Sequence, residues 1–170
     1  MSTLVVYESM WGNTGAVAEA VARGLGEGVT PVDMADAPAP VPDGIDLLVL
    51  GGPTHAFSMT RASTRRDAIA KGATTGPAER GIREWLAQLP ASDHLDVATF
   101  DTRVGSVRHL PGSAARAAGK EVRRHHLGQM VATMSFYVGD MAGPLLDGEV
   151  ERAHAWGRSL AGRRVGGTPT

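Results

Sequence analysis

Small polar side chains crowd a short stretch near the amino terminus. Residues 9–14 read Ser-Met-Trp-Gly-Asn-Thr and separate an apolar run from a helical pattern. Backbone N–H groups at the start of a helix, with small neutral donors beside them, form a nest suited to phosphate. The pattern is neither Gly-x-Gly-x-x-Gly nor a loop ending in Gly-Lys-Ser/Thr, so the lysine of triphosphate chemistry is missing. The stretch predicts binding of a phosphomonoester, with simple helix capping by Asn13 or Thr14 as the alternative.

Two later stretches also combine glycines with polar side chains. Residues 51–59 read Gly-Gly-Pro-Thr-His-Ala-Phe-Ser-Met, and residues 99–105 read Thr-Phe-Asp-Thr-Arg-Val-Gly. Glycines permit close backbone approach to a ligand and unusual dihedral angles. Both stretches follow apolar runs, as residues 9–14 do, so all three are candidate parts of one site. An exposed loop histidine without a role is the alternative for His55.

Several other chemistries are excluded by the residue types. The chain has no cysteine, which excludes a disulfide framework, an iron–sulfur cluster, a thiol nucleophile and a cysteine zinc site. The six histidines are scattered, and the adjacent His125 and His126 point different ways on a helix, so we expect no metal site. No Gly-x-Ser-x-Gly motif is present, which disfavours hydrolysis. Redox chemistry would therefore require a bound cofactor.

The candidate loops must be positioned by alternating strands and helices. Nearly continuous apolar runs predict strands at residues 3–7, 29–33, 46–50, 96–100 and 131–138. Apolar stripes predict helices at residues 13–25, from Pro77 to Leu89, 113–125 and 149–161. This order predicts an α/β, doubly wound parallel sheet with helices on both faces, in which ligands bind at the carboxyl ends of the strands.

Length and charge indicate one ordinary domain. At 170 residues the chain can bury a core, and we expect a single domain over residues 1–165 with a short tail at 166–170. The start of the chain lacks the pattern of a signal peptide, and no run reaches membrane-spanning length, so we expect a cytoplasmic protein without a membrane partner. A net charge of −1 argues against nucleic acid.

Two of the stretches resemble the flavodoxin family. Ser-x-x-Gly-Asn-Thr directly after the first strand is similar to the flavodoxin phosphate loop, and Ser9, Gly12, Asn13 and Thr14 match it. Trp11 departs, because it stands where the family often has a second hydroxyl residue. Gly-x-Pro-Thr followed by an aromatic residue resembles the family's loop beside the flavin. The resemblance implies the flavodoxin-like sheet of five strands in the order 2-1-3-4-5.

The same resemblance implies FMN as the cofactor. In flavodoxins the loop hydroxyls, the Asn side chain and backbone amides hold the phosphate, and His55 or Phe57 would stack on the isoalloxazine. No Tyr or Trp follows the fourth strand, so one flavin face is expected to be open, with Arg103 near it. The implied cofactor-binding residues are Ser9, Met10, Trp11, Gly12, Asn13, Thr14, Pro53, Thr54, His55, Ala56, Phe57, Asp101, Thr102, Arg103 and Gly105.

Three functions are consistent with this site. An electron carrier that cycles FMN is favoured, since the protein then supplies binding and electrostatics. The alternative is an FMN-dependent oxidoreductase acting on a quinone, a porphyrinogen or another small molecule, which the open flavin face and nearby basic residues indicate. A flavin-free interaction module is the third, because a fold does not guarantee a function.

Two groups of cations bear on the partner. Arg61, Arg65, Arg66 and Lys71 follow the second loop, and Arg116, Lys120, Arg123 and Arg124 recur at helical spacing. A solvated helix face would explain such a stripe. The other interpretation is docking of an acidic redox partner protein, or of an anionic substrate or second cofactor, beside the flavin.

Overall fold

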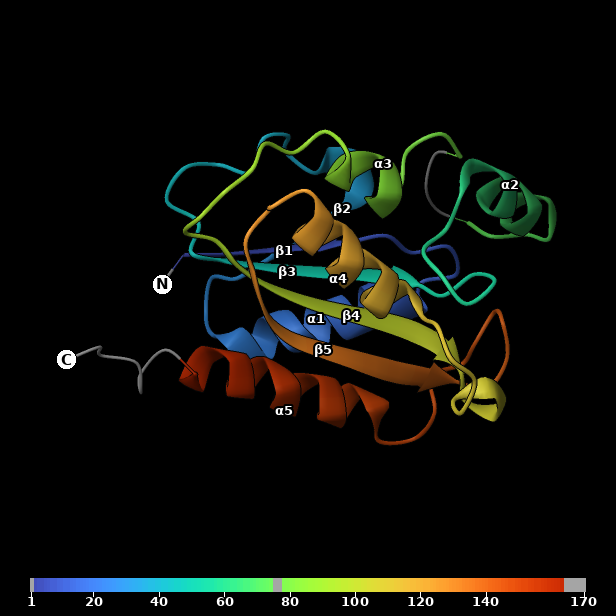
Figure 1. The fold of residues 1–170 in the computed structure, drawn as a ribbon. Helices are drawn as coiled ribbons and strands as arrows, with labels where there is room; N and C mark the ends of the chain where they lie inside the picture. The colour runs from blue at the N-terminus through green and yellow to red at the C-terminus, as the bar shows by residue number, and fades with distance from the viewer. Residues whose placement is uncertain (1, 75–77, 164–170) are drawn as a thin grey trace.

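Five parallel strands form one sheet at the centre of the protein. The computed structural model describes residues 2–74 and 78–163. The strands are β1 (Thr3–Tyr7), β2 (Pro31–Asp33), β3 (Leu47–Pro53), β4 (Asp96–Val104) and β5 (Gln129–Val138). Their order across the sheet is β2-β1-β3-β4-β5, and every neighbouring pair is parallel (Figure 1). The predicted sheet and its strand order are confirmed.

Strands β3 and β4 run further than the sequence predicts. Their ladder continues through Gly52 opposite Asp101 and Pro53 opposite Thr102, and the Thr54 N–H then donates to the Thr102 carbonyl at 2.8 Å. The prediction that residues 101–103 form a loop is therefore wrong. These polar residues belong to the strand because their backbone groups are paired and their side chains find buried partners.

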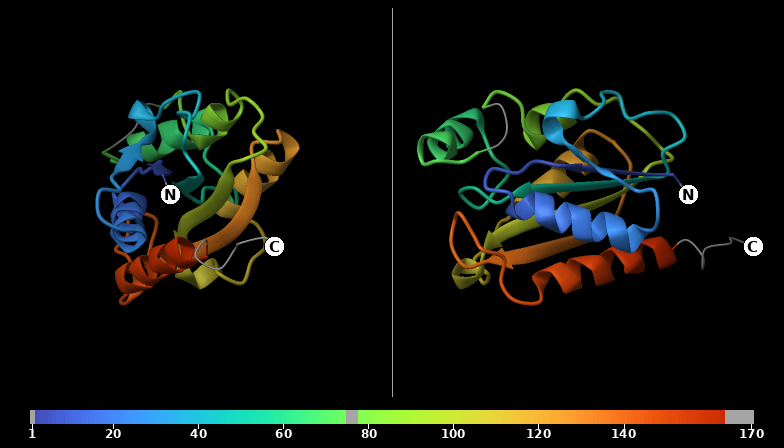
Figure 2. Two further views of the ribbon diagram at one scale, coloured as in Figure 1. Left: turned by 90° about the vertical axis from the view of Figure 1, so that its left-hand side faces the viewer. Right: turned by 180° about the vertical axis from the view of Figure 1, so that it is seen from behind.

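Four helices cover the two faces of the sheet. Helices α1 (Asn13–Leu25) and α5 (Glu149–Gly162) lie side by side on one face, as Figure 2 shows from behind. Helices α3 (Ile82–Leu86) and α4 (Ala114–Arg124) cover the other face. A Cβ on Gly24 would lie 2.1 Å from the His154 carbonyl oxygen, so glycine is required where α1 and α5 cross. The predicted helices at 13–25, 113–125 and 149–161 are thus observed within one residue at each end.

Each face has its own apolar core. Phe100, Phe136 and Trp156 meet edge to face between the sheet and the α1–α5 layer, with ring centroids 6.0 to 6.1 Å apart. On the opposite face Trp85 is fully buried, and its indole N–H donates to the Pro38 carbonyl at 3.0 Å. These two cores hold the sheet rigid, so the strand ends present their polar residues at fixed positions.

Helix α2 (Ala62–Ala70) was not predicted from the sequence. Only Arg65 and Ala68 are buried along it, so it carries no apolar stripe for a sequence pattern to detect. Figure 1 shows it beyond the carboxyl ends of the strands, apart from both helical layers. The helix that we expected from Pro77 begins at Ile82 instead, and Pro77 lies outside the described residues.

Two short 3-10 turns complete the described chain, η1 (Met34–Asp36) and η2 (Gly105–Val107). Within residues 2–74 and 78–163, no helix has the length and apolar character needed to cross a membrane. The predicted tail at 166–170 lies outside the described residues.

Candidate functional site

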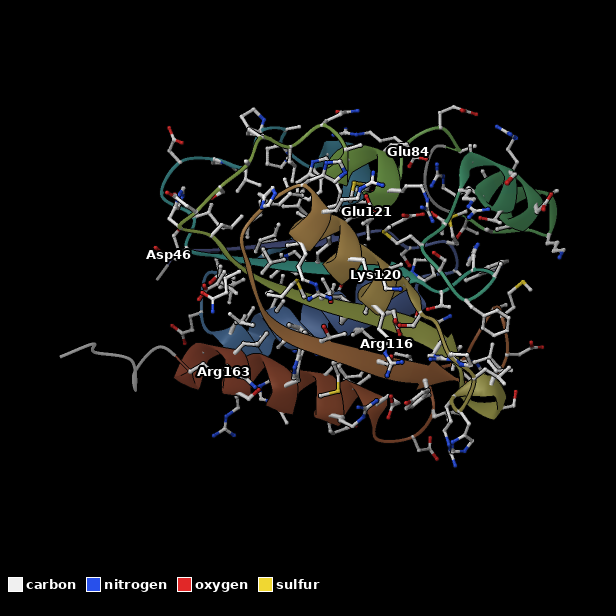
Figure 3. All side chains as sticks on the ribbon, viewed as in Figure 1. Asp46, Glu84, Arg116, Lys120, Glu121 and Arg163 are labelled. Atoms are coloured by element: carbon white, nitrogen blue, oxygen red, sulfur yellow. The ribbon has the colours of Figure 1, made fainter. Side chains whose placement is uncertain are left out.

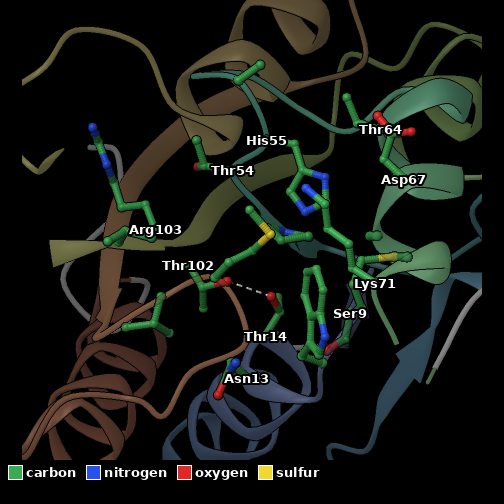
Figure 4. A pocket seen from close by; sticks show the side chains of 18 residues that line it. Ser9, Asn13, Thr14, Thr54, His55, Thr64, Asp67, Lys71, Thr102 and Arg103 are labelled. Carbon is green, nitrogen blue, oxygen red and sulfur yellow. Dashed lines mark hydrogen bonds between the residues drawn. The ribbon is translucent and has the colours of Figure 1, made fainter. Parts of the chain in front are cut away.

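A cavity of about 250 Å³ opens at the carboxyl ends of β1, β3 and β4, with α2 as its far wall. The residues that the sequence predicts and that line it are Ser9, Met10, Trp11, Asn13, Thr14, Pro53, Thr54, His55, Ala56, Thr102 and Arg103. Figure 4 shows residues of α1, β3, β4 and α2 converging on this space. Three stretches that are far apart in the sequence therefore share one site.

The start of α1 leaves backbone donors available to a ligand. Gly12 is the N-cap, with φ at 89°, so neither Asn13 nor Thr14 occupies the capping position, and the alternative of simple capping by these residues is wrong. The Ser9 hydroxyl oxygen accepts from the Gly12 and Gly15 N–H groups at 3.1 and 3.3 Å. First-turn N–H groups have no partner within their own helix. Across the described residues, no acceptor is paired with the N–H of Asn13 or Thr14.

The side chains of the same turn are held against neighbouring segments. The Thr14 and Thr102 hydroxyl oxygens lie 2.7 Å apart in a buried hydrogen bond, drawn as the dashed line in Figure 4. The Asn13 amide packs against Gly143, where an added Cβ would come within 2.7 Å of the amide oxygen. The hydroxyl bond connects α1 to β4 directly, so the floor of the cavity is a fixed polar surface.

A strained turn after β3 separates two side chains that the sequence groups together. Residues His55 and Ser58 exchange backbone hydrogen bonds of 2.9 and 3.1 Å across Ala56 and Phe57, whose φ angles are 49° and 62°. Left-handed geometry at two residues with side chains is uncommon and costs free energy. The turn directs His55 into the cavity, whereas Phe57 is 47% exposed and does not line it.

The surroundings of His55 favour the neutral form of its imidazole. Burial lowers the pKa of the His55 imidazole, and the charges of Arg65 and Lys71 lower it further. The Trp11 ring lies beside it, with ring centroids 6.4 Å apart. A neutral imidazole offers one N–H and one acceptor nitrogen, so His55 can face a polar or flat aromatic ligand without introducing charge.

Helix α2 adds cavity residues that sequence reasoning missed. Thr64, Asp67, Ala68 and Lys71 line the cavity from this side. The sequence groups Lys71 with the cations that follow the second loop, and Figure 4 shows it near His55. No local signal distinguishes these residues from a solvated polar segment. Only the placement of α2 brings them to the site.

Three other predicted residues lie outside the cavity. Asp101 is fully buried on the opposite face of β4, where its Oδ2 accepts the Ala115 N–H at 2.9 Å. Burial raises the pKa of this carboxyl, against opposing hydrogen bonds from Ser113 and Ala115. Gly12 and Gly105 shape the backbone at the N-cap of α1 and the start of η2 without lining the space.

Arg103 lines the cavity through its stem, not its charge. Its Nη2 donates to the carbonyls of Val107 and Leu110 at 2.8 and 3.1 Å, which fastens η2 and the following turn to β4. Figure 4 shows the guanidinium directed away from Asn13 and Thr14. The side chain therefore organises the rim rather than placing a cation beside the α1 loop.

A buried network of hydrogen bonds and ion pairs lies behind the cavity. It comprises Glu8, Thr60, Arg65 and Glu84 and is called the knot. Arg65 and Glu8 are 1% and 5% exposed, and Thr60 between them donates its hydroxyl to Glu8 and accepts from Arg65 Nη1 at 2.7 Å. Arg65 Nη1 lies 3.9 Å from Glu8 Oε1, and Arg65 Nη2 donates to Glu84 at 2.8 Å. The expectation that Arg65 belongs to a basic surface is wrong, because its charge is satisfied inside the protein.

This knot joins the three segments that shape the site. Glu8 directly precedes the α1 loop, Thr60 ends the turn after β3, and Arg65 lies on α2. The backbone N–H of Ile82 at the start of α3 also donates to Glu8 Oε2 at 3.0 Å. Burial raises the pKa of Glu8, and the Thr60 hydroxyl, the Ile82 N–H and Arg65 oppose that rise.

Comparison with known proteins bears on the fold. No family model and no curated protein matches the sequence. Among solved structures, an archaeal flavodoxin is similar over 95% of this chain and 96% of its own, with 17% identity and a TM-score of 0.60. Oxidised flavodoxin 1 from Bacillus cereus matches over 96% and 99%, with 16% identity and a TM-score of 0.59. A flavodoxin, WrbA-like protein from Agrobacterium tumefaciens matches over 94% of both chains, with 20% identity and a TM-score of 0.53.

The chain therefore has the flavodoxin fold over nearly its whole length. Its cavity lies at the carboxyl edge beside the switch in strand order between β1 and β3, where ligands bind in open sheets of this kind.

Proposed function

We propose that the cavity binds FMN, with the phosphate at the start of α1. The observation that carries this proposal is the pair of N–H groups, on Asn13 and Thr14, that no acceptor in the described part of the chain satisfies. They begin a helix, whose dipole favours an anion. The resemblance of residues 9–14 to the flavodoxin loop and the names of the structural neighbours support the same ligand.

The residues of the cavity fit such a ligand. Ser9 and Asn13 offer neutral polar groups beside the helix start, and Thr14 offers a hydroxyl shared with Thr102. Thr54 and the neutral His55 lie further along the strand ends, where they would border the ring system. Bound FMN would supply one- and two-electron redox chemistry, while the protein binds and orients it and limits access of water.

Electron transfer is the function that we propose for the loaded protein. A second candidate is an FMN-dependent oxidoreductase for a small molecule such as a quinone or porphyrinogen. The α2 wall favours that candidate, since Thr64, Asp67 and Lys71 add polar groups next to His55. Steady-state turnover with NAD(P)H and a quinone distinguishes the two, because an electron carrier turns over little without its partner protein.

Comparison of FMN with riboflavin tests the ligand. The purified protein is expected to show flavin absorption, and mass spectrometry of the released cofactor is expected to identify FMN. Flavin-free protein should bind FMN at least about tenfold more tightly than riboflavin, since one charge-assisted phosphate contact alone supplies roughly 1.5 kcal/mol.

Matched variants locate the phosphate. Asn13→Ala should weaken FMN binding and leave riboflavin binding unchanged, while Ser159→Ala on the far helix α5 should change neither. Equal affinities for the two flavins, or a colourless protein that binds neither, would contradict the proposal.

A further inference from the structure

Charge is distributed unevenly along the chain although the net charge is only −1. Residues 24–60 contain five acidic residues and no lysine or arginine, whereas residues 103–124 contain six lysines and arginines and one glutamate. Figure 3 shows the consequence: Arg116 and Lys120 project from α4, and Asp46 lies at the opposite, amino-terminal edge of the sheet. A partner of high charge would therefore meet the molecule in a preferred orientation.

Two large apolar side chains are exposed where the basic segment reaches the cavity. Phe57 and Leu110 are 47% and 48% exposed. Their segments touch, because an added Cβ on Gly112 would lie 2.7 Å from the Phe57 carbonyl oxygen, and the Ala114 N–H donates to the Thr54 hydroxyl at 3.0 Å. The exposed cations Arg108, Arg116 and Lys120 lie close to Leu110 and Gly112 along the chain. Protein interfaces commonly combine exposed apolar groups with a polar rim.

The turn that carries Phe57 is itself strained. Ala56 and Phe57 both adopt left-handed φ angles, at 49° and 62°. Strained backbone persists where surrounding structure over-determines it, and it gathers at functional sites. Here the strain holds an aromatic side chain in solvent directly beside Ala56, a residue of the cavity wall.

We propose that an acidic redox partner protein docks on this surface, which comprises Phe57, Arg108, Leu110, Arg116 and Lys120 and is called the docking face. Phe57 and Leu110 bury apolar area of the partner, and the three cations, all exposed, meet its carboxylates. The proposal rests on the proposed function, because the electron passes to or from a flavin in the adjacent cavity. Bound FMN would exchange one electron with the partner's iron–sulfur or haem centre, so that one centre is oxidised as the other is reduced and no bond forms between the proteins.

The charges argue against a symmetric contact between copies of this chain. In a two-fold dimer each docking face would meet its own image, so Arg108, Arg116 and Lys120 would face the same three cations. Within the described residues no ion pair neutralises these three side chains, and the nearby Glu121 pairs instead with Arg124 and His125. An acidic surface is the complement that removes this repulsion.

The test measures both binding and electron transfer with probe proteins of opposite charge. The probes are a small acidic [2Fe–2S] protein and a small basic c-type cytochrome. Binding to the flavin-free protein is followed by fluorescence anisotropy, and electron transfer with the FMN-loaded protein by stopped-flow absorbance, across a series of salt concentrations. Binding to the flavin-free protein tests the docking face even if FMN binding fails, so the two proposals are separated.

The variants are matched in charge. Arg116→Glu/Lys120→Glu should weaken binding of the acidic probe and slow electron transfer about tenfold or more at low salt, with the effect shrinking as salt rises. The control pair Arg23→Glu/Arg158→Glu, at exposed positions of α1 and α5, changes the net charge equally. It should alter the affinity for the acidic probe and the electron-transfer rate by less than about twofold. Phe57→Ala should weaken binding about tenfold with little dependence on salt.

Three outcomes would overturn the docking face. One is an equal effect of the two charge-reversed pairs, which would show a dependence on net charge alone. Another is tighter binding of the basic probe than of the acidic one. The third is a concentration-dependent dimer in sedimentation experiments that Phe57→Ala dissociates, since the face would then serve a second copy of the chain.

Discussion

Two helices that begin at the same edge of the sheet, α1 and α4, differ in whether their first-turn N–H groups have acceptors. At α4 the first three N–H groups donate to the Thr54 hydroxyl at 3.0 Å, Asp101 at 2.9 Å and the Ser113 hydroxyl at 3.4 Å. At α1 the Gly15 N–H donates to the Ser9 hydroxyl at 3.3 Å. The N–H groups of Asn13 and Thr14 have no acceptor among the described residues. A helix dipole is common to both ends, so the difference lies in the side chains around them.

A carboxylate decides the difference at α4. Asp101 occupies the position that an anionic ligand would take, and the fold buries it completely there. At α1 the corresponding neighbour is the neutral Ser9. The nearest carboxylate in sequence, Glu8, is directed into the knot with Thr60 and Arg65. The comparison teaches that internal satisfaction of helix donors, rather than the presence of a helix start, determines where a phosphate can bind.

The largest expected effect comes from removing the knot that holds Glu8 away from the α1 loop. Arg65→Met leaves a buried carboxylate without its cation and should lower the free energy of unfolding by about 4 kcal/mol. Arg66→Met is the matched control, because the Arg66 side chain is 58% exposed and its ion pair with Glu79 lies in solvent. Its effect should stay below about 0.5 kcal/mol. Urea denaturation measures both, and similar losses would show that Arg65 is not a structural charge.

A carboxylate placed at α1 should make it resemble α4. Ser9→Asp puts a negative charge close to the proposed phosphate and should weaken FMN binding by roughly 3 kcal/mol, about a hundredfold, for charges near 5 Å at an effective dielectric constant of about 20. Riboflavin binding should hardly change. Ser9→Asn is the control, because asparagine has the shape of aspartate but no charge. An equal loss of FMN affinity in both variants would contradict the electrostatic explanation.

The converse change removes the carboxylate that accepts a first-turn N–H of α4. Asp101→Ala leaves the Ala115 N–H unpaired and should cost about 2 kcal/mol of stability. Urea denaturation of Asp101→Ala at neutral pH provides the measurement. A cost near zero would mean that water or Ser113 satisfies the helix start equally well.

The same residue predicts a dependence of stability on pH. Burial raises the pKa of Asp101 in the folded protein, so the folded state binds this proton more tightly than the unfolded state does. The stabilisation that comes from this tighter proton binding is therefore full below the unfolded pKa and is lost as the pH rises through the folded pKa. Asp101→Asn should remove this loss of stability with rising pH. Urea denaturation at a series of pH values provides the measurement. Parallel profiles for the two proteins would contradict the assignment.

The smallest effect concerns the strained turn between the two helix ends. Ala56→Gly relieves a left-handed conformation at φ 49° but increases the freedom of the unfolded chain. The net gain in stability should be about 0.5 kcal/mol, small because the two effects oppose each other. Thermal denaturation measures it, with Ala87→Gly at the end of α3 as a control that should destabilise. A loss of stability in Ala56→Gly would show that the turn is not strained in solution.

Local patterns accounted for most of the elements but not for the edges of the site. Strand β1 and helix α1 have both predicted ends in place, because apolar runs and stripes report burial directly. The strand character of Asp101, Thr102 and Arg103 was missed, since polar residues at a strand end look like a loop until their partners are known. Helix α2 was missed for the related reason that an interior ion pair, not an apolar stripe, attaches it to the protein.

The sequence by itself determined the alternation of strands and helices and the polar character of three loops, because both follow from local residue order. The resemblance of residues 9–14 to a known loop added the strand order and the expectation that FMN is the ligand. Only the tertiary structure decided which donors remain open, that Arg65 is an internal cation, and that α2 closes the cavity. These properties depend on partners such as Glu8 and Arg65, which lie far apart in the sequence, and pairing at that distance leaves no local pattern to read.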